Sequence, residues 1–180
     1  MNLRSSSHRA CGRQTGFTLF EVLIVLVLIG VMAGLATLSL GDGAERELRR
    51  EADRLATVLK LARDELLISG GSERALGIRR DSYSLLDLVL LDDATREWQP
   101  VNDAQLGPHV VTEGLLELDF EAANQPRSLS SSTVWTPQLR LSNTGEMTPG
   151  LIILRAREHN LQRFIQVELT GNIEVLSERP

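Results

Sequence analysis

A run of nineteen residues without a charged side chain, from Val22 to Leu40, limits what this chain can become more than any other feature. A helix needs about 20 residues to cross a hydrocarbon core of roughly 30 Å at about 1.5 Å per residue. The apolar residues just before Val22 extend the run to that length. A helix buried in a soluble core would be shorter and would carry a polar stripe. The run therefore predicts a membrane-spanning helix.

The residues on either side of this run predict its orientation. The first sixteen residues carry three arginines, Arg4, Arg9 and Arg13, and no acid, whereas Asp42 and Glu45 follow the run. Because cytoplasmic flanks carry the excess of basic residues, the N-terminus is expected in the cytoplasm and residues 41–180 on the other side of the membrane. A secretory signal is a weaker interpretation, because its apolar region is shorter and a small-residue cleavage site follows it. A lipoprotein signal would place its cysteine after the run, whereas Cys11 precedes it.

Glu21 interrupts the apolar segment near its start. A carboxylate at full membrane depth costs on the order of 2–3 kcal/mol, and less near the interface, so a side chain that only reaches the headgroups is one interpretation. Residues 13–21 read Arg-Gln-Thr-Gly-Phe-Thr-Leu-Phe-Glu. This segment resembles the type IV pilin-like, or class III, signal. In that signal a short basic leader ends in Gly, and Phe-Thr-Leu-x-Glu then opens an apolar helix.

The resemblance implies that a prepilin peptidase cuts between Gly16 and Phe17, that the new amine of Phe17 is N-methylated, and that Glu21 serves assembly. The residue types suit this chemistry, since Gly16 has no side chain to obstruct a protease. An unpaired charge in a low dielectric is costly, and a hydrogen-bonded pair costs far less. The carboxylate of Glu21 lies one helical turn from Phe17 and can pair with its own or a neighbouring subunit's amine. Our hypothesis is that this pair favours one register of helix stacking.

The rest of the chain predicts a helix followed by a β-rich domain. From 44 to 69, apolar residues recur at gaps of four and three, as in an amphipathic helix; they are Leu48, Ala52, Leu55, Leu59, Ala62 and Leu66. Ser69-Gly70-Gly71 is expected to end that helix. The period then falls to two, which predicts strands at 74–79, 82–91, 116–121, 134–141, 151–155, 164–169 and 173–176. Pro137 argues for an edge strand or a bulge. Residues 92–108 and 122–133 are expected to be polar loops.

This order is typical of the pilin-like α+β architecture, a long N-terminal helix packed on an antiparallel β-sheet. The later half is similar to the H-type minor pseudopilins (GspH) of type II secretion, through residues 141–149 and the Gly-containing hairpin that closes the chain. The expected organisation is a cleaved leader at 1–16, a transmembrane helix half at 17–40, an amphipathic half at 41–70 and a head domain at 71–180. No acidic C-terminal loop suited to calcium is evident.

Composition argues against other classes of protein. The net charge is −5, and without the first sixteen residues 16 basic residues face 24 acidic ones, which disfavours nucleic-acid binding. The arginines near 46–54 are interleaved with acids and are read as a solvated helix face. The single cysteine excludes an intrachain disulfide. No metal or cofactor is expected, because His8, His109 and His159 lack ligand spacing and Asp92-Asp93 is read as a solvated turn.

Remaining candidates for chemistry are few. His109 and His159 are expected at the surface, and Trp98 and Trp135 in core or rim packing, with a partner anchor as the alternative. No nucleophile, Walker-type or dinucleotide motif is present, so the chain is not expected to be an enzyme, and a membrane-tethered periplasmic enzyme is disfavoured.

We therefore expect a structural minor subunit of the type II secretion pseudopilus, held in the inner membrane with a periplasmic head. By resemblance, it would link the tip to the shaft. The expected partners are other pseudopilins, prepilin peptidase and the inner-membrane secretion platform. The alternative is a minor pilin of a type IV or DNA-uptake pilus.

Overall fold

The fold is that of a computed structural model, which describes residues 18–91, 95–111, 115–122, 125–127 and 134–180, without the side chains of 34–42 and 125–127. Helix α1 runs from Leu19 to Ser69 and passes through residues 41–43 uninterrupted. The chain divides into two units, residues 1–40 and residues 41–180. No helix in the described part of the chain combines the length and the apolar character that crossing a membrane requires.

Two antiparallel sheets form the larger unit. The first sheet has the order β3-β2-β1-β7, with β4 also paired to β2. Its strands are β1 (Arg74–Ile78), β2 (Ser82–Leu90), β3 (Arg96–Pro100), β4 (His109–Val110) and β7 (Pro137–Leu141). The second sheet has the order β10-β9-β8-β5-β6. Its strands are β5 (Leu116–Ala122), β6 (Gln125–Arg127), β8 (Gly150–Ala156), β9 (Gln162–Val167) and β10 (Ile173–Leu176).

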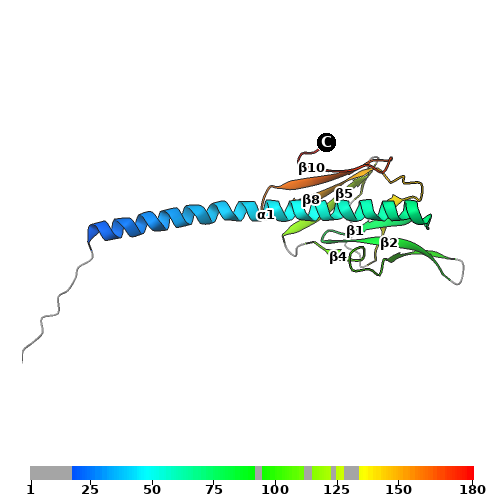
Figure 1. Ribbon diagram of the computed structural model, residues 1–180, viewed down its shortest axis with the longest axis horizontal. Helices are drawn as coiled ribbons and strands as arrows, with labels where there is room; N and C mark the ends of the chain where they lie inside the picture. Colours follow the sequence, from blue (N-terminus) through cyan, green and yellow to red (C-terminus); the bar gives the residue numbers. More distant parts are fainter. Residues whose placement is uncertain (1–17, 92–94, 112–114, 123–124, 128–133) are drawn as a thin grey trace, which may run out of the picture. The chain divides into compact units, whose positions relative to one another are not determined.

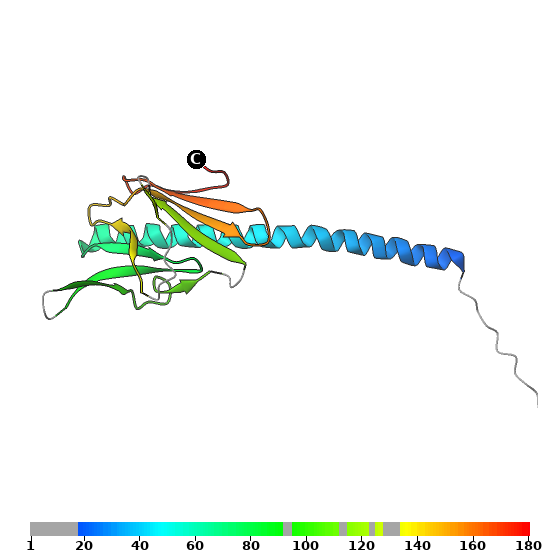
Figure 2. The ribbon, with the colours of Figure 1, turned by 180° about the vertical axis from the view of Figure 1, so that it is seen from behind.

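The part of α1 within this unit packs against both sheets. In Figure 1, β10, β8 and β5 lie above this part of the helix and β1, β2 and β4 below it, and Figure 2 shows the same arrangement from behind. The apolar face predicted from the sequence is buried: Leu55, Leu59 and Ala62 are 0% exposed. Its residues join one core with Leu76 and Leu85 of the first sheet and with Phe120 and Ile152 of the second. Removal of this apolar surface from water supplies the main driving force for folding.

Two glycine turns fix the far end of this helix against the second sheet and its connections. Gly171, between β9 and β10, has φ +80°, a conformation that side-chain-bearing residues rarely adopt. A Cβ at Gly171 would lie 2.4 Å from the carbonyl oxygen of Gly145, so the two turns approach too closely for any other residue. The Arg63 guanidinium donates a hydrogen bond to the carbonyl oxygen of Gly171. The helix itself ends in a left-handed Gly70, as the Ser69-Gly70-Gly71 signal predicts.

The strand predictions are largely confirmed, with three corrections. Residues 92–108 are not wholly loop, because β3 (Arg96–Pro100) pairs with β2 at the sheet edge, where a mostly exposed, charged strand is tolerated. Likewise β6 (Gln125–Arg127) lies within the predicted loop 122–133. The strand predicted from residue 134 begins only at Pro137, which has no N–H to donate to a ladder. Pro137 lies in an edge strand and beside a shift of register, as predicted.

Candidate functional site

Thr18 caps the start of α1. The side-chain oxygen of Thr18 accepts a hydrogen bond from the Glu21 backbone N–H at 3.2 Å, and its carbonyl oxygen accepts from the same N–H at 3.0 Å. A Thr at the N-cap satisfies one of the backbone donors that the first turn of a helix leaves without an intrahelical partner. The cap places the Glu21 carboxylate in the first helical turn, where the positive end of the helix dipole favours a negative charge. The Thr-x-x-Glu spacing signals this cap in the sequence.

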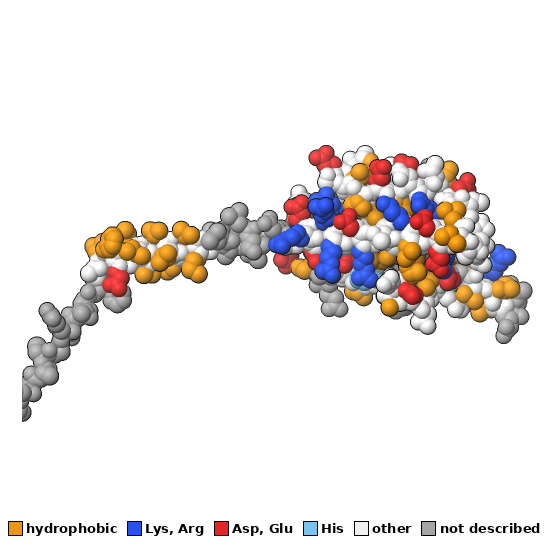
Figure 3. Space-filling view, viewed as in Figure 1, with side chains coloured by type: hydrophobic (Ala, Val, Ile, Leu, Met, Phe, Trp, Pro, Cys, Tyr) orange, Lys and Arg blue, Asp and Glu red, His pale blue; other side chains and the backbone are white. Residues whose placement is uncertain are grey.

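The stretch that follows is coated with apolar side chains. Leu19 is 85% exposed and Phe20 69%, and the hydrophobic residues up to Met32 are exposed as well. Figure 3 shows these side chains around the helix, with an acidic group near its start. Scattered single apolar residues on a surface need no explanation, but a continuous apolar coat indicates a surface made for contact with protein or lipid.

The predicted cleavage site lies outside the described residues. Gly16 and Phe17 belong to that part of the chain, as do the side chains of residues 34–40 within the predicted span 17–40. The structure places only Glu21 of the three predicted site residues, in an exposed position on a capped helix. The pairing of its carboxylate with an amine of Phe17 therefore stays a prediction.

A partly buried polar pair in the head was not foreseen from the sequence. His109 was expected at the surface, but its Nε2 lies 3.1 Å from a carboxylate oxygen of Glu51, and the side chain of Glu51 is only 7% exposed. The prediction for His109 was wrong because β4 pairs with β2 and so brings this ring against α1. No local motif could reveal a contact between residues 58 positions apart. His159, in contrast, is exposed as predicted.

Tyr83 lies beside this pair, with its ring centroid 5.1 Å from that of His109. The Tyr83 hydroxyl is buried without a hydrogen bond of normal geometry, and the Arg54 side chain approaches it. Burial raises the pKa of Tyr83 well above its ordinary value, opposed by the nearby positive charge of Arg54. The group of Glu51, His109 and Tyr83 joins β4 to the helix.

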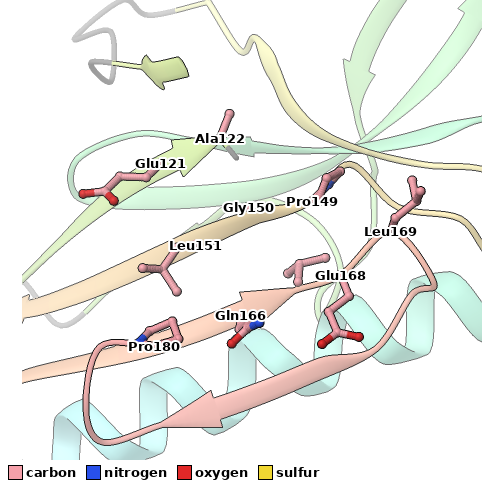
Figure 4. Close-up of a pocket in the computed structure, with 10 residues that line it drawn as sticks. Glu121, Ala122, Pro149, Gly150, Leu151, Gln166, Glu168, Leu169 and Pro180 are labelled. Carbon is pink, nitrogen blue, oxygen red and sulfur yellow. The ribbon is translucent and has the colours of Figure 1, made fainter. Parts of the chain in front are cut away.

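The concave surfaces of the head carry no catalytic arrangement among the described residues. A shallow pocket of about 450 Å³ lies on the second sheet, where Glu121, Leu151, Gln166 and Pro180 line it (Figure 4). The carboxylate of Glu121 forms an ion pair with the guanidinium of Arg179, with 2.6 Å between nitrogen and oxygen. In the described part of the chain no three His, Cys, Asp or Glu side chains come together to hold a metal. Asp92 and Asp93 lie outside the described residues.

Comparisons with known proteins agree with this arrangement. A family model described as a prokaryotic N-terminal methylation motif matches residues 11–37. The type II secretion system protein H of Pseudomonas aeruginosa is 36% identical over 152 residues, which cover 79% of this chain and 83% of the relative. The protein of the same name from Aeromonas hydrophila is 27% identical, over 92% of this chain and 95% of the relative.

Two solved structures share the fold. The minor pseudopilin EpsH from the type 2 secretion system of Vibrio cholerae matches with a TM-score of 0.55 at 25% identity, over 73% of this chain and 97% of that one. The solution structure of Escherichia coli GspH matches with a TM-score of 0.57, over 73% of this chain and 88% of that one. Because the identity is 18%, this likeness concerns the fold alone.

Proposed function

The chain belongs to the family of type II secretion system protein H, the H-type minor pseudopilins, and on this premise we propose that it is a structural subunit of a secretion pseudopilus. Its relatives are structural subunits and not enzymes, and no catalytic group in the described residues argues otherwise. The single observation that carries the proposal is the 36% identity to a protein H over most of both chains. No observation favours a type IV or DNA-uptake pilin.

The N-terminal helix would supply the assembly contact. Its apolar coat from Leu19 to Met32 is suited to pack beside the helices of neighbouring subunits. Before assembly the same surface would anchor the protein in the inner membrane, in a single pass with the N-terminus cytoplasmic and the head periplasmic. The match of the methylation-motif model supports the membrane anchor, and the charges on either side of the apolar run support this orientation.

Processing would prepare the subunit for assembly. A prepilin peptidase would cut between Gly16 and Phe17, remove Cys11 with the leader, and leave a cationic amine that methylation preserves. Glu21 would meet that amine, in its own or a neighbouring chain, and fix the register between helices. The capped first turn supports this role, because it holds the backbone of Glu21 in the helix from its first residues.

The partners would be other pseudopilins, with this subunit joining the tip to the shaft, together with the prepilin peptidase and the inner-membrane platform. A gene deletion tests the function. We expect the deletion strain to release little secreted protein into the medium, to retain twitching motility, and to recover when the full chain is supplied on a plasmid. Normal export with lost twitching would instead support a type IV pilin, and normal export with normal twitching would contradict both.

A further inference from the structure

One face of the first sheet is turned away from helix α1 and carries its own cluster of side chains. Leu85 of β2 faces the helix within the core, so its neighbour Leu86 faces the other way, because successive strand residues alternate. Leu88 shares the face of Leu86 and lies directly opposite Trp98 of β3, and side chains directly opposite each other share a face. Trp98 therefore lies on the outer face of the first sheet.

The second tryptophan of the chain reaches the same face. A Cβ built on Gly77 of β1 would lie 3.1 Å from Leu86 and 3.1 Å from the ring of Trp135, so Gly77 leaves space for this indole beside Leu86. The guanidinium of Arg79 stands over the Trp135 ring at 3.6 Å from its centroid. Both tryptophans of the chain thus lie on one face, and both are partly exposed.

The charges that the paired strands carry on this face are basic. Arg140 of β7 is in register with Ala75, which is in register with Leu86, and its guanidinium lies 5.8 Å from the Trp98 ring centroid. The acids of these strands, Asp87 and Glu97, fall at the alternate positions and face the opposite side. Glu73, before β1, lines a shallow pocket together with Arg140 at the rim, and no ion pair joins the two in the described chain.

Apolar surface accompanies these charges toward the end of the β2–β3 hairpin. Leu86 is 0% exposed beneath the tryptophans, whereas Leu90, two pairs further along the same face, is 65% exposed. We define the outer face of the first sheet by Arg79, Leu88, Leu90, Trp98, Trp135 and Arg140. Tryptophan and arginine beside an apolar centre are the residues that carry most of the binding energy in protein interfaces.

A protein surface suits this face better than a nucleic acid. Bases bind single-stranded sites by stacking on open aromatic rings, but Arg79 covers one side of the Trp135 ring and Gly77 and Leu86 adjoin the indole as well. The two guanidiniums beside the rings, in a chain of net charge −5, complement a local acidic surface.

We propose that the outer face of the first sheet binds an acidic surface of a different pseudopilin in the same filament. This inference rests on the proposed function and names the part of the head that selects a neighbour. Apolar contact over Leu88, Leu90 and Trp98 would supply affinity, and Arg140 and Arg79 would set the orientation of the partner.

The two tryptophans make the face directly observable. The full-length chain alone would be labelled with 5-fluorotryptophan, kept in detergent, and titrated with each of the other pseudopilins of its own secretion system while ¹⁹F spectra are recorded. For one of these pseudopilins, we expect the ¹⁹F resonances of both Trp98 and Trp135 to shift. Arg140→Glu should weaken that binding by at least about tenfold, and salt should weaken binding of the unmodified chain. Arg157→Glu, the same charge change at an exposed site beside the second sheet, should bind as the unmodified chain does.

Several outcomes would overturn the inference. These are binding without a shift of either resonance, equal affinity of the Arg140→Glu variant, and no binding to any of the pseudopilins. Shifts caused by a single-stranded oligonucleotide would assign the face to nucleic acid, and shifts that grow with the chain's own concentration would assign it to a second copy. Equal unfolding curves of Arg140→Glu and the unmodified chain would exclude misfolding. The proposed function is judged separately by export in the deletion strain, so the two can fail independently.

Discussion

Glu21 is the acidic side chain on an otherwise apolar first stretch of α1, and its place in a capped turn makes it the residue on which assembly would depend. The Thr18 cap and the helix dipole both accommodate a carboxylate in the first turn. The structure alone does not require this acid, because a polar uncharged side chain would also fit an exposed position. Its charge therefore points to a cationic partner, such as the amine of Phe17 in the same or a neighbouring chain.

We predict that Glu21→Gln removes most of the export supported by the chain, about tenfold or more, because the amide keeps the size but lacks the negative charge of an ion pair with a cationic amine. Export is measured as enzyme activity in the medium of a deletion strain that carries the variant. Glu158→Gln, at an exposed position of the head, is the matched control and should export normally. Normal export by Glu21→Gln would contradict the pairing hypothesis.

Tyr83 gives the head a predictable response to alkali. Because burial raises the pKa of Tyr83 in the folded chain, the unfolded chain loses this proton from about pH 10 while the folded chain keeps it. The stabilisation is fully present below pH 10 and declines as the pH rises from there toward the folded pKa. Since Tyr83 is the only tyrosine, its ionisation can be followed by ultraviolet absorbance.

At pH 10.5, roughly half a unit above the ordinary pKa, we expect the absorbance of the folded chain to be that of a neutral tyrosine. In denaturant, the absorbance should change to that of the ionised tyrosine as the pH rises through the ordinary pKa. Tyr83→Phe removes a buried hydroxyl that has no hydrogen bond of normal geometry. It should change the free energy of unfolding at pH 7 by less than about 1 kcal/mol and flatten the loss of stability above pH 10. Ordinary titration of Tyr83 in the folded chain would contradict its burial.

At the scale of elements, the part of α1 beyond residue 43 depends on one buried face. Leu55 is 0% exposed in the core between the helix and the sheets. We predict that Leu55→Ala lowers the free energy of unfolding by about 2–5 kcal/mol, through lost burial and a residual cavity. Leu61→Ala, on the same helix but 47% exposed, should cost far less. Urea unfolding of the two variants, followed by circular dichroism, compares them, and equal losses would contradict this packing.

The sequence predicted this helix well and the sheet edges poorly, for a physical reason. Leu and Ala at gaps of three and four lie on one face of a helix, so the six residues predicted for that face are buried as expected. The hydrogen bonds at the two helix ends, between Glu21 and Thr18 and between Gly70 and Leu66, join residues close in sequence. Both are therefore signalled by local sequence patterns. Strand β3 leaves none, because its Arg-Glu-Trp-Gln-Pro sequence has one apolar residue, and its pairing with β2 alone defines it.

Some residues of the candidate site could be predicted from the sequence, and others could not. Gly16, Phe17 and Glu21 form a motif that is complete within a few residues, so the sequence alone could propose it. The Glu51–His109 pair and the meeting of Trp98 with Arg140 depend on strand order. Such contacts join residues from separate helices and strands, and a sequence without its fold contains no spacing that reveals them.

At the scale of the whole molecule, the chain would be made in one form and used in another. The first unit, residues 1–40, would contain a leader that is removed and a helix that is kept. The second unit, residues 41–180, is a packed head whose core does not depend on that processing. The amine that Glu21 would meet arises from one cut, between Gly16 and Phe17.

Mass spectrometry of the full-length protein extracted from membranes therefore tests the central claim most directly. We predict a mature chain that begins at Phe17, carries one methyl group on its amine and lacks Cys11. A strain without prepilin peptidase should yield the chain with its leader, as a control for the cut. A membrane-extracted protein that keeps its first sixteen residues in a strain with active peptidase, or that begins elsewhere with an unmodified amine, would contradict the account.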